Sequence, residues 1–193
     1  MPEFIEENAR ELDPRSLRGL AHPLRMRLLT ALRHHGPATA SQLADRLGES
    51  SGATSYHLRQ LAAHGFVEDD PELGKGRERW WKAAHQGVSL NPELYFDPDP
   101  EVQGALNTFV NQIATMHGQE LSTWLGTRHE WPAQWATAAD FSDFTLRLTP
   151  ELLEEMETKV HDLIDSYRER ALPDDADTAQ IRVHLHAFPQ NNA

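Results

Sequence analysis

Apolar residues in the segment 24–65 recur with the periodicity of an α-helix, and the pattern predicts three consecutive helices. Each helix is followed by a glycine. The residues that would face inward are Leu24, Leu28, Leu29 and Leu32, then Leu43, Ala44 and Leu47, then Thr54, Leu58, Leu61 and Ala62, with Gly36, Gly48 and Gly65 as the stops. Thr39 and Gln42 have the spacing of a capping box, and Ser50 or Ser51 can cap the third helix. The two short helices over residues 39–65 therefore predict a helix-turn-helix, whose second helix can enter a DNA major groove.

The period changes after Gly65. Residues 66–69 read as a strand, residues 70–76 as a turn and residues 77–83 as a returning strand. A two-stranded hairpin after three helices predicts a winged helix-turn-helix. Trp80 and Trp81 are adjacent on the second strand, so they should point to opposite faces. One should enter the core, and we expect the other to pack on the C-terminal region or on a partner subunit.

The remaining chain predicts a second, mainly helical region. Residues 89–100 are rich in proline and aspartate and read as a linker. Residues 101–127 carry a wide apolar helical stripe, which we take as the candidate dimer seam, and residues 143–148, 150–170 and 181–187 read as strand, helix and strand. The residues of the helix over 150–170 that we expect to point inward are Leu152, Leu153, Met156, Val160, Leu163, Ile164 and Tyr167. The predicted fold class is mainly α with small β: an acidic helix or arm over residues 1–13, a winged helix-turn-helix over 14–88, the linker over 89–100, and a helical and small α+β dimerisation region over 101–193.

The charge of the chain is unevenly distributed. The formal net charge is −12, yet residues 14–90 hold 11 Lys and Arg against 7 Asp and Glu. Residues 91–193 hold 6 Lys and Arg against 18 Asp and Glu. The basic segment therefore coincides with the predicted DNA-binding module, as phosphate contacts require. The acidic half is either a solvated surface, which is the simpler interpretation, or a region held away from DNA.

Four short motifs resemble those of the ArsR family of bacterial winged-helix transcriptional regulators. They are Leu20-Ala21-His22-Pro23-Leu24-Arg25-Met26-Arg27-Leu28-Leu29, Gln42-Leu43-Ala44, Ser55-Tyr56-His57-Leu58-Arg59-Gln60-Leu61 and Gly65-Phe66-Val67. The resemblance covers residues 17–85, and the rest is similar to C-terminal extensions on some actinobacterial regulators of this type. It implies a homodimer that binds a palindromic operator and usually represses transcription.

Nine residues are the candidate DNA contacts. They are Gln42, Ser51, Thr54, Ser55, Tyr56, His57, Arg59, Lys75 and Arg77. Hydroxyl groups can meet phosphates or bases, and Arg59 can reach a guanine edge or a phosphate. Gln42 has the position of a phosphate contact, and Lys75 and Arg77 near the wing tip suit the backbone or minor groove. The structural alternative is that Tyr56 and His57 are packing residues and that the serines are caps.

Other chemistry finds little support in the sequence. The chain has no cysteine, so the thiolate metal sites of many ArsR-family members are impossible. The histidine pairs His34–His35 and His184–His186, and His117 with Glu120, fall short of the three or four ligands that a metal needs. We therefore expect no metal and no cofactor. No glycine-rich phosphate loop, HExxH or GxSxG motif indicates an enzyme.

The aromatic residues of the C-terminal half are a weaker indication of a ligand. Trp124, Trp131, Trp135, Phe141 and Phe144 could line a pocket for an apolar effector, although ordinary core is the simpler interpretation.

The chain lacks an apolar run long enough to span a membrane, and the acidic N-terminus does not resemble a signal peptide. We therefore expect a cytoplasmic, sequence-specific DNA-binding transcriptional regulator, acting as a homodimeric repressor. The alternative is a winged-helix module that binds protein without specific DNA binding.

Overall fold

The computed structural model describes residues 9–73, 78–168, 170 and 177–190. The chain divides into two compact units, Ile5–Glu120 and a second unit that begins at Leu121. None of the helices within the described ranges is long and apolar enough to cross a bilayer. The two units are taken in turn below.

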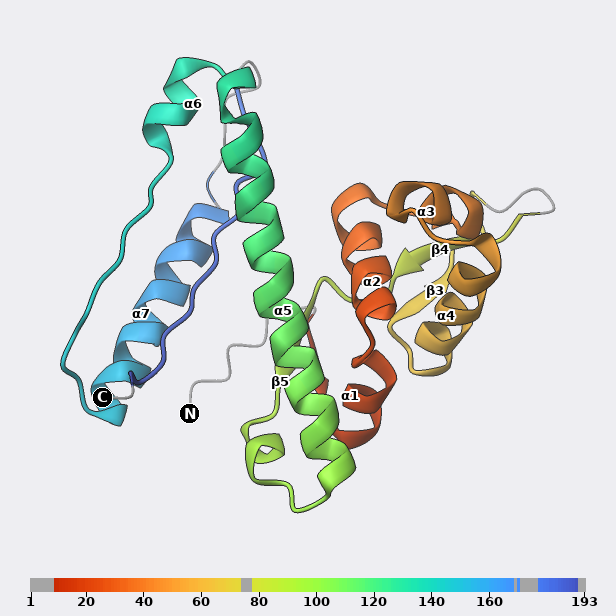
Figure 1. The fold of residues 1–193 in the computed structure, drawn as a ribbon, viewed down its shortest axis with the longest axis horizontal. Coiled ribbons are helices and arrows are strands. Elements are labelled where there is room, and N and C mark those ends of the chain that lie inside the picture. The colour runs from red at the N-terminus through yellow and green to blue at the C-terminus, as the bar shows by residue number, and fades with distance from the viewer. Residues whose placement is uncertain (1–8, 74–77, 169, 171–176, 191–193) are drawn as a thin grey trace. The chain divides into compact units, whose positions relative to one another are not determined.

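Four helices build the first unit around its apolar centre (Figure 1). They are α1 (Pro14–Leu20), α2 (Pro23–His35), α3 (Ala40–Leu47) and α4 (Ser51–Ala63). Asp13 and His22 cap the first two helices, each with proline at the first helical position. Gly36, Gly48 and Gly65 all have positive φ, at 77°, 68° and 71°, so the expected glycine stops are confirmed.

A three-stranded antiparallel sheet forms the wing side of this unit. Its order is β2 (Ala38–Thr39), β4 (Trp80–Ala83), β3 (Val67–Asp69), with Val67 opposite Ala83 and Thr39 opposite Trp80. The predicted hairpin is confirmed. The two tryptophans take opposite faces as expected: Trp81 is 4% exposed in the core and Trp80 is only half-buried.

The segment before α1 differs from the predicted acidic helix or arm. Residues 9–12 form a strand, β1 (Ala9–Leu12), which pairs in parallel with β5 (Gly87–Leu90) in register Ala9 to Gly87. Leu12 is 0% exposed. Arg10 donates from Nη1 to the carbonyl of His64, at the end of α4, and its guanidinium lies 4.7 Å from the Phe66 ring centre. This strand is therefore an integral part of the first unit.

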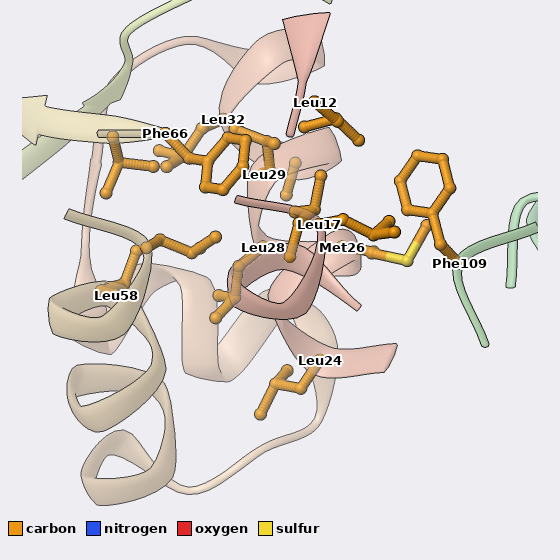
Figure 2. Packing of buried hydrophobic residues seen from close by; sticks show 14 of the residues in the cluster. Leu12, Leu17, Leu24, Met26, Leu28, Leu29, Leu32, Leu58, Phe66 and Phe109 are labelled. Carbon is orange, nitrogen blue, oxygen red and sulfur yellow. The ribbon is translucent and has the colours of Figure 1, made fainter. Parts of the chain in front are cut away.

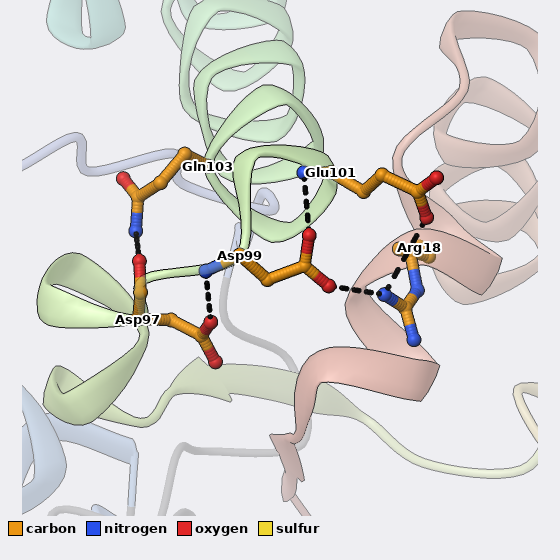
Figure 3. A network of polar contacts seen from close by, with 5 residues as sticks. All are labelled: Arg18, Asp97, Asp99, Glu101 and Gln103. Atoms are coloured by element: carbon orange, nitrogen blue, oxygen red, sulfur yellow. Dashed lines mark hydrogen bonds and ion pairs between the residues drawn. The ribbon is translucent and has the colours of Figure 1, made fainter.

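The predicted linker is also structured. It contains the end of β5, a 3₁₀ turn η1 (Pro92–Phe96) and the start of α5 (Pro100–Thr127). Figure 3 shows how α5 is joined to α1: Arg18 Nη1 lies 3.2 Å from Asp99 Oδ2 and 3.9 Å from Glu101 Oε2. Gln103 donates to the carbonyls of residues 94 and 97, at 2.8 and 2.9 Å. The compact unit consequently continues past the expected boundary, to Glu120.

One apolar cluster unites these elements. Figure 2 shows Phe109 of α5 beside Met26 of α2, with Leu12, Leu17 and Leu29 around them. Val102, Leu106 and Phe109 are at most 3% exposed. Burying a side chain of this size contributes about 1.5–3 kcal/mol, so the first turns of α5 stabilise the first unit. Part of the apolar stripe that the sequence suggested as a dimer seam is thus used within one chain.

The regular secondary structure described in the second unit is helical. Besides the end of α5 it contains η2 (Arg128–Glu130), α6 (Ala133–Ala138) and α7 (Pro150–Arg168) (Figure 1). The strands predicted over residues 143–148 and 181–187 are wrong, because none of the described residues from 121 onward is in a strand. The small α+β region is thus absent from this part of the described chain. Short alternating segments indicate strand only when a neighbour supplies the backbone hydrogen bonds.

The aromatic residues of this unit do not form the ordinary core that was expected. Trp124 lies 5.4 Å from Phe141 and Trp131 lies 6.3 Å from Trp135, measured between ring centres. Trp131, Phe141 and Phe144 are nonetheless 42%, 56% and 78% exposed.

Candidate nucleic-acid interface

The helix α4 is fixed to the protein by one face and leaves the other exposed. Leu58 and Leu61 are 0% exposed and belong to the apolar cluster. Ser51, Tyr56 and Arg59 lie on exposed positions, with Tyr56 at 52%. A 13-residue helix is about 20 Å long, which is sufficient to lie along a stretch of major groove. The arrangement therefore presents a polar helical face on a rigid base.

The turn before α4 sets the angle between the two helices. Gly48 takes the left-handed conformation, with φ 68° and ψ 34°, and Ser50 caps α4 by accepting from the backbone N–H of Ala53 at 3.2 Å. Arg27 of α2 donates to the carbonyl of Leu47 at 2.7 Å and to Glu49 Oε1 at 3.0 Å. The turn is thus fixed from both sides. Ser50, rather than Ser51, is the cap, which leaves the Ser51 hydroxyl for another partner.

The start of α3 is built as the sequence predicted. The backbone N–H of Gln42 donates to Thr39 Oγ1 at 3.3 Å, and the backbone N–H of Thr39 donates to Gln42 Oε1 at 2.9 Å. This capping box uses the carbonyl oxygen of the Gln42 amide. The exposed amide can present its N–H donors outward, which suits an anionic partner such as a phosphate.

A surface groove of about 270 Å³ lies where α3, α4 and the wing meet. It is lined by Thr39, Ala40, Ser41, Ser55, Arg59, Glu78, Arg79 and Trp81. The structure therefore brings Ser55 and Arg59 together with a second arginine, Arg79. The Arg79 guanidinium lies 4.1 Å from the Trp81 ring centre, and its Nε lies 3.2 Å from Asp69 Oδ2.

Sequence reasoning missed Arg79 and Ser41. Arg79 immediately precedes β4 and its half-buried Trp80, and Ser41 lies in the first turn of α3. Both positions are adjacent to residues that were singled out. The β3–β4 pairing places Asp69 opposite Trp81, two residues after Arg79, and the opposite charges of Asp69 and Arg79 across the predicted hairpin are the signal that could have identified Arg79.

His57 and Tyr56 are packing residues as well as candidate contacts. The His57 ring lies 4.3 Å from the His22 ring and 5.1 Å from the Tyr56 ring, between centres. Burial lowers the pKa of His57, and His22 and Arg25 lower that pKa further while Glu49 opposes them. Burial and Arg25 lower the pKa of His22 as well. Both rings are therefore neutral at pH 7. Their contact connects the start of α2 to the middle of α4.

Thr54 must be removed from the candidate contacts. It is 0% exposed, and its Oγ1 has no hydrogen-bond partner among the residues that the structure describes. Its place on the α4 face that carries Leu58 and Leu61 turns it into the protein. Lys75 and Arg77 lie outside the described residues, so their proposed contact with DNA stays a prediction.

The acidic residues around the wing are partly occupied within the protein. Asp69 pairs with Arg79, and Glu68 Oε1 lies 3.4 Å from Lys82 Nζ. Asp70 is 9% exposed, and its Oδ1 accepts from the backbone N–H of Glu72 at 3.1 Å. Their repulsion of a phosphate is therefore reduced.

Histidines and carboxylates do not converge elsewhere. Within the described ranges no group of three or more His, Asp or Glu side chains is arranged to hold a metal ion. His184 and His186 contact each other with ring centres 6.5 Å apart, and His34 and His35 with centres 6.3 Å apart.

Comparison with known proteins identifies the central part of this unit. Residues 20–70 match the family described as a helix-turn-helix domain. No significant match is found among curated protein sequences.

Several solved structures are similar in part. A mutant of ZitR from Lactococcus lactis in apo form is 16% identical over 75% of this chain and 81% of that chain, with a TM-score of 0.31. YusO from Bacillus subtilis is 13% identical over 81% of each chain, with a TM-score of 0.34. The transcriptional regulator PA4135 is 19% identical over 56% of this chain and 75% of that chain, with a TM-score of 0.33.

These values are too low to carry an argument about function, which rests instead on the family match and on the geometry of α3, α4 and the wing. Residues 20–70 of this chain form a helix-turn-helix domain within a winged-helix unit. The presence of this domain supports the conclusion that the protein is a DNA-binding regulator.

Proposed function

We propose that the protein is a sequence-specific DNA-binding transcriptional regulator of the ArsR type, acting as a homodimeric repressor on a palindromic operator. The observation that carries the proposal is the position of α4. Its apolar face is anchored by Leu58 and Leu61, while Ser51, Ser55 and Arg59 lie on the side that meets the groove or solvent. A helix presented in this way can contact base edges without rearrangement of the protein.

Each side chain has a distinct role in this proposal. Arg59 contacts a base edge, with guanine as the preferred partner of its two-pronged guanidinium. Ser51, Ser55 and Tyr56 supply hydroxyls to bases or phosphates, and Gln42 holds a phosphate at the start of α3. His57 supports Tyr56 through their ring contact. Arg79, and Lys75 and Arg77 as predicted from sequence, contact the DNA backbone beside the helix.

The charge distribution supports the same arrangement. Residues 14–90 carry 11 Lys and Arg against 7 Asp and Glu, whereas the chain as a whole has net charge −12. DNA would thus meet the only segment with a positive balance. Because phosphate contacts release counterions, affinity should fall linearly with salt on logarithmic axes.

The experiment that tests this function is binding of the full chain to a labelled mixed-sequence duplex at low and moderate salt, followed by fluorescence anisotropy. Binding that weakens steeply with salt supports the proposal. Arg79→Ala should reduce the salt slope, since it removes a cation proposed to contact the DNA backbone. Absence of binding at low salt would instead favour a winged-helix module for protein partners.

The homodimer places two copies of α4 on successive half-sites about 34–36 Å apart, which is one turn of DNA. A reporter gene under a bound promoter decides between repression and activation. Any small-molecule effector belongs to the same proposal and would be detected as a change in operator affinity. The proposal assigns no catalytic role.

A further inference from the structure

The second unit lacks the buried core that supports the first. From Val110 onward none of the described residues is buried. Exposed apolar side chains are instead frequent, including Leu146, Leu152, Leu163, Ile181 and Val183, which are between 48% and 65% exposed. Large exposed apolar areas mark surfaces that another molecule covers.

The most continuous of these surfaces is a groove of about 400 Å³ along α7. Its lining is Leu148, Leu152, Glu155, Met156, Lys159, Val160 and Leu163. Tyr167, one further turn along the same face, is 63% exposed. This face was expected to point inward, yet Leu152, Leu163 and Tyr167 are 48%, 59% and 63% exposed within one chain.

The spacing of the apolar residues on this face is self-complementary. Leu152, Met156, Leu163 and Tyr167 are separated by intervals of four, seven and four residues, which read the same in both directions. When two identical helices pack antiparallel about a two-fold axis, residue i meets residue j and j meets i. Centring the axis between Lys159 and Val160 brings Leu152 opposite Tyr167 and Met156 opposite Leu163.

The charges beside the groove fit the same alignment. Lys159 would be level with Val160 of the partner subunit, and Asp162 of the partner subunit would lie two residues, about 3 Å, further along the axis. Symmetry gives this contact between Lys159 and Asp162 twice. Glu155, whose Oε1 is 2.5 Å from Lys159 Nζ within one chain, would join the same cluster. The same alignment places Lys159 of the two subunits one residue, about 1.5 Å, apart along the axis, and the Asp162 and Glu155 carboxylates of both subunits flank these two lysines.

From this geometry we propose that two copies of the chain associate through α7, packed antiparallel along the face that contains Leu152, Met156, Leu163 and Tyr167. The inference rests on the homodimer in the proposed function and assigns its surface. It replaces the earlier candidate, α5, because Val102, Leu106 and Phe109 of that helix are already buried within the first unit.

The test is sedimentation of the full chain without DNA, over a range of micromolar concentrations. The wild type should be a dimer. Leu163→Gln should raise the dimer dissociation constant by roughly 100-fold, because a polar side chain replaces the leucine at two symmetric places in the interface. Because Leu163 is 59% exposed in the single chain, the helix content of the Leu163→Gln variant, measured by circular dichroism, should equal that of the wild type.

The matched control is Leu121→Gln, which changes a 43% exposed leucine on α5. It should leave the dimer intact. A monomeric wild type, equal dissociation constants for wild type and Leu163→Gln, or dissociation by Leu121→Gln alone would each overturn the proposal.

Charge reversal tests the antiparallel alignment independently. Lys159→Asp and Asp162→Lys should each weaken the dimer by roughly fivefold, and the double variant should recover most of that loss. Failure of the double variant to recover would refute this alignment. Because DNA is absent from all these measurements, their outcome is separate from that of the DNA-binding proposal.

Discussion

Thr54 lies on α4, the helix proposed to contact DNA, but its buried hydroxyl predicts an effect on stability and none on DNA binding. The residue is 0% exposed, and within the described part of the chain its Oγ1 has no hydrogen-bond partner. Thr54→Val keeps the branched shape of the side chain and removes the hydroxyl. We expect the variant to be more stable than the wild type and to bind DNA equally well.

The magnitude follows from the environment. Leaving a buried polar group without a partner costs about 1–3 kcal/mol. Threonine and valine have similar helix propensities, so the backbone contributes little to the difference. We expect the free energy of unfolding to rise by about 1–2 kcal/mol. With a typical urea dependence of about 1–3 kcal/mol per molar, the midpoint should rise by roughly 0.3–2 M.

Urea unfolding of the full chain, followed by circular dichroism, measures this change. Hydrogen exchange of the amides in α4 localises it. Thr54→Ala is the matched control: it also removes the hydroxyl but leaves an unfilled space, so its stability should be below that of Thr54→Val. A Thr54→Val variant less stable than the wild type would show that the hydroxyl is bonded, and weaker DNA binding would restore Thr54 as a contact.

Three further predictions concern the same unit. Acidification below about pH 6.5 should destabilise the fold, because burial lowers the pKa of His22 and His57 below the ordinary value of 6.5. The unfolded chain then binds protons first, so stability is complete above pH 6.5 and is lost progressively as the pH falls; a melting temperature constant from pH 7.5 to 5.5 would contradict this. Thr39→Ala should reduce the free energy of unfolding by about 1 kcal/mol through loss of the α3 cap, measured by urea titration with the exposed Ser41→Ala as control. Asp69→Asn should increase DNA affinity at low salt by releasing Arg79 from its 3.2 Å ion pair, whereas the same change in an Arg79→Ala background should have a smaller effect in the anisotropy assay.

Local signals in the sequence were sufficient for the helix-turn-helix. The Thr39–Gln42 capping box, the turn at Gly48 and the stop at Gly65 each depend on a few neighbouring residues, and all three are present. The wing was also predictable, since its strands adjoin one turn. In contrast, the parallel pairing of β1 with β5 joins residues 9 and 87, and no local pattern specifies such a distant partner.

Periodicity identified amphipathic faces but not what covers them. The stripe on α5 begins within the core of the winged-helix unit, through Val102 and Phe109, although it read as a dimer seam. The α7 face read as inward and is exposed, at 48% for Leu152 and 59% for Leu163. Arg79 was missed because its role depends on the groove that α3, α4 and β4 form together. Burial and electrostatic environment depend on tertiary packing, which a single sequence pattern does not supply.

The central claim is that α4 reads DNA sequence through Arg59. Selection from a pool of random duplexes with the full chain tests it most directly, with Arg59→Ala run in parallel. We expect the wild type to enrich an inverted repeat whose half-sites are about 10–10.5 base pairs apart. Arg59→Ala should bind that repeat about 1–3 kcal/mol more weakly and lose preference at one base of each half-site. No enrichment at low salt, or the same repeat enriched equally by both proteins, would contradict this account.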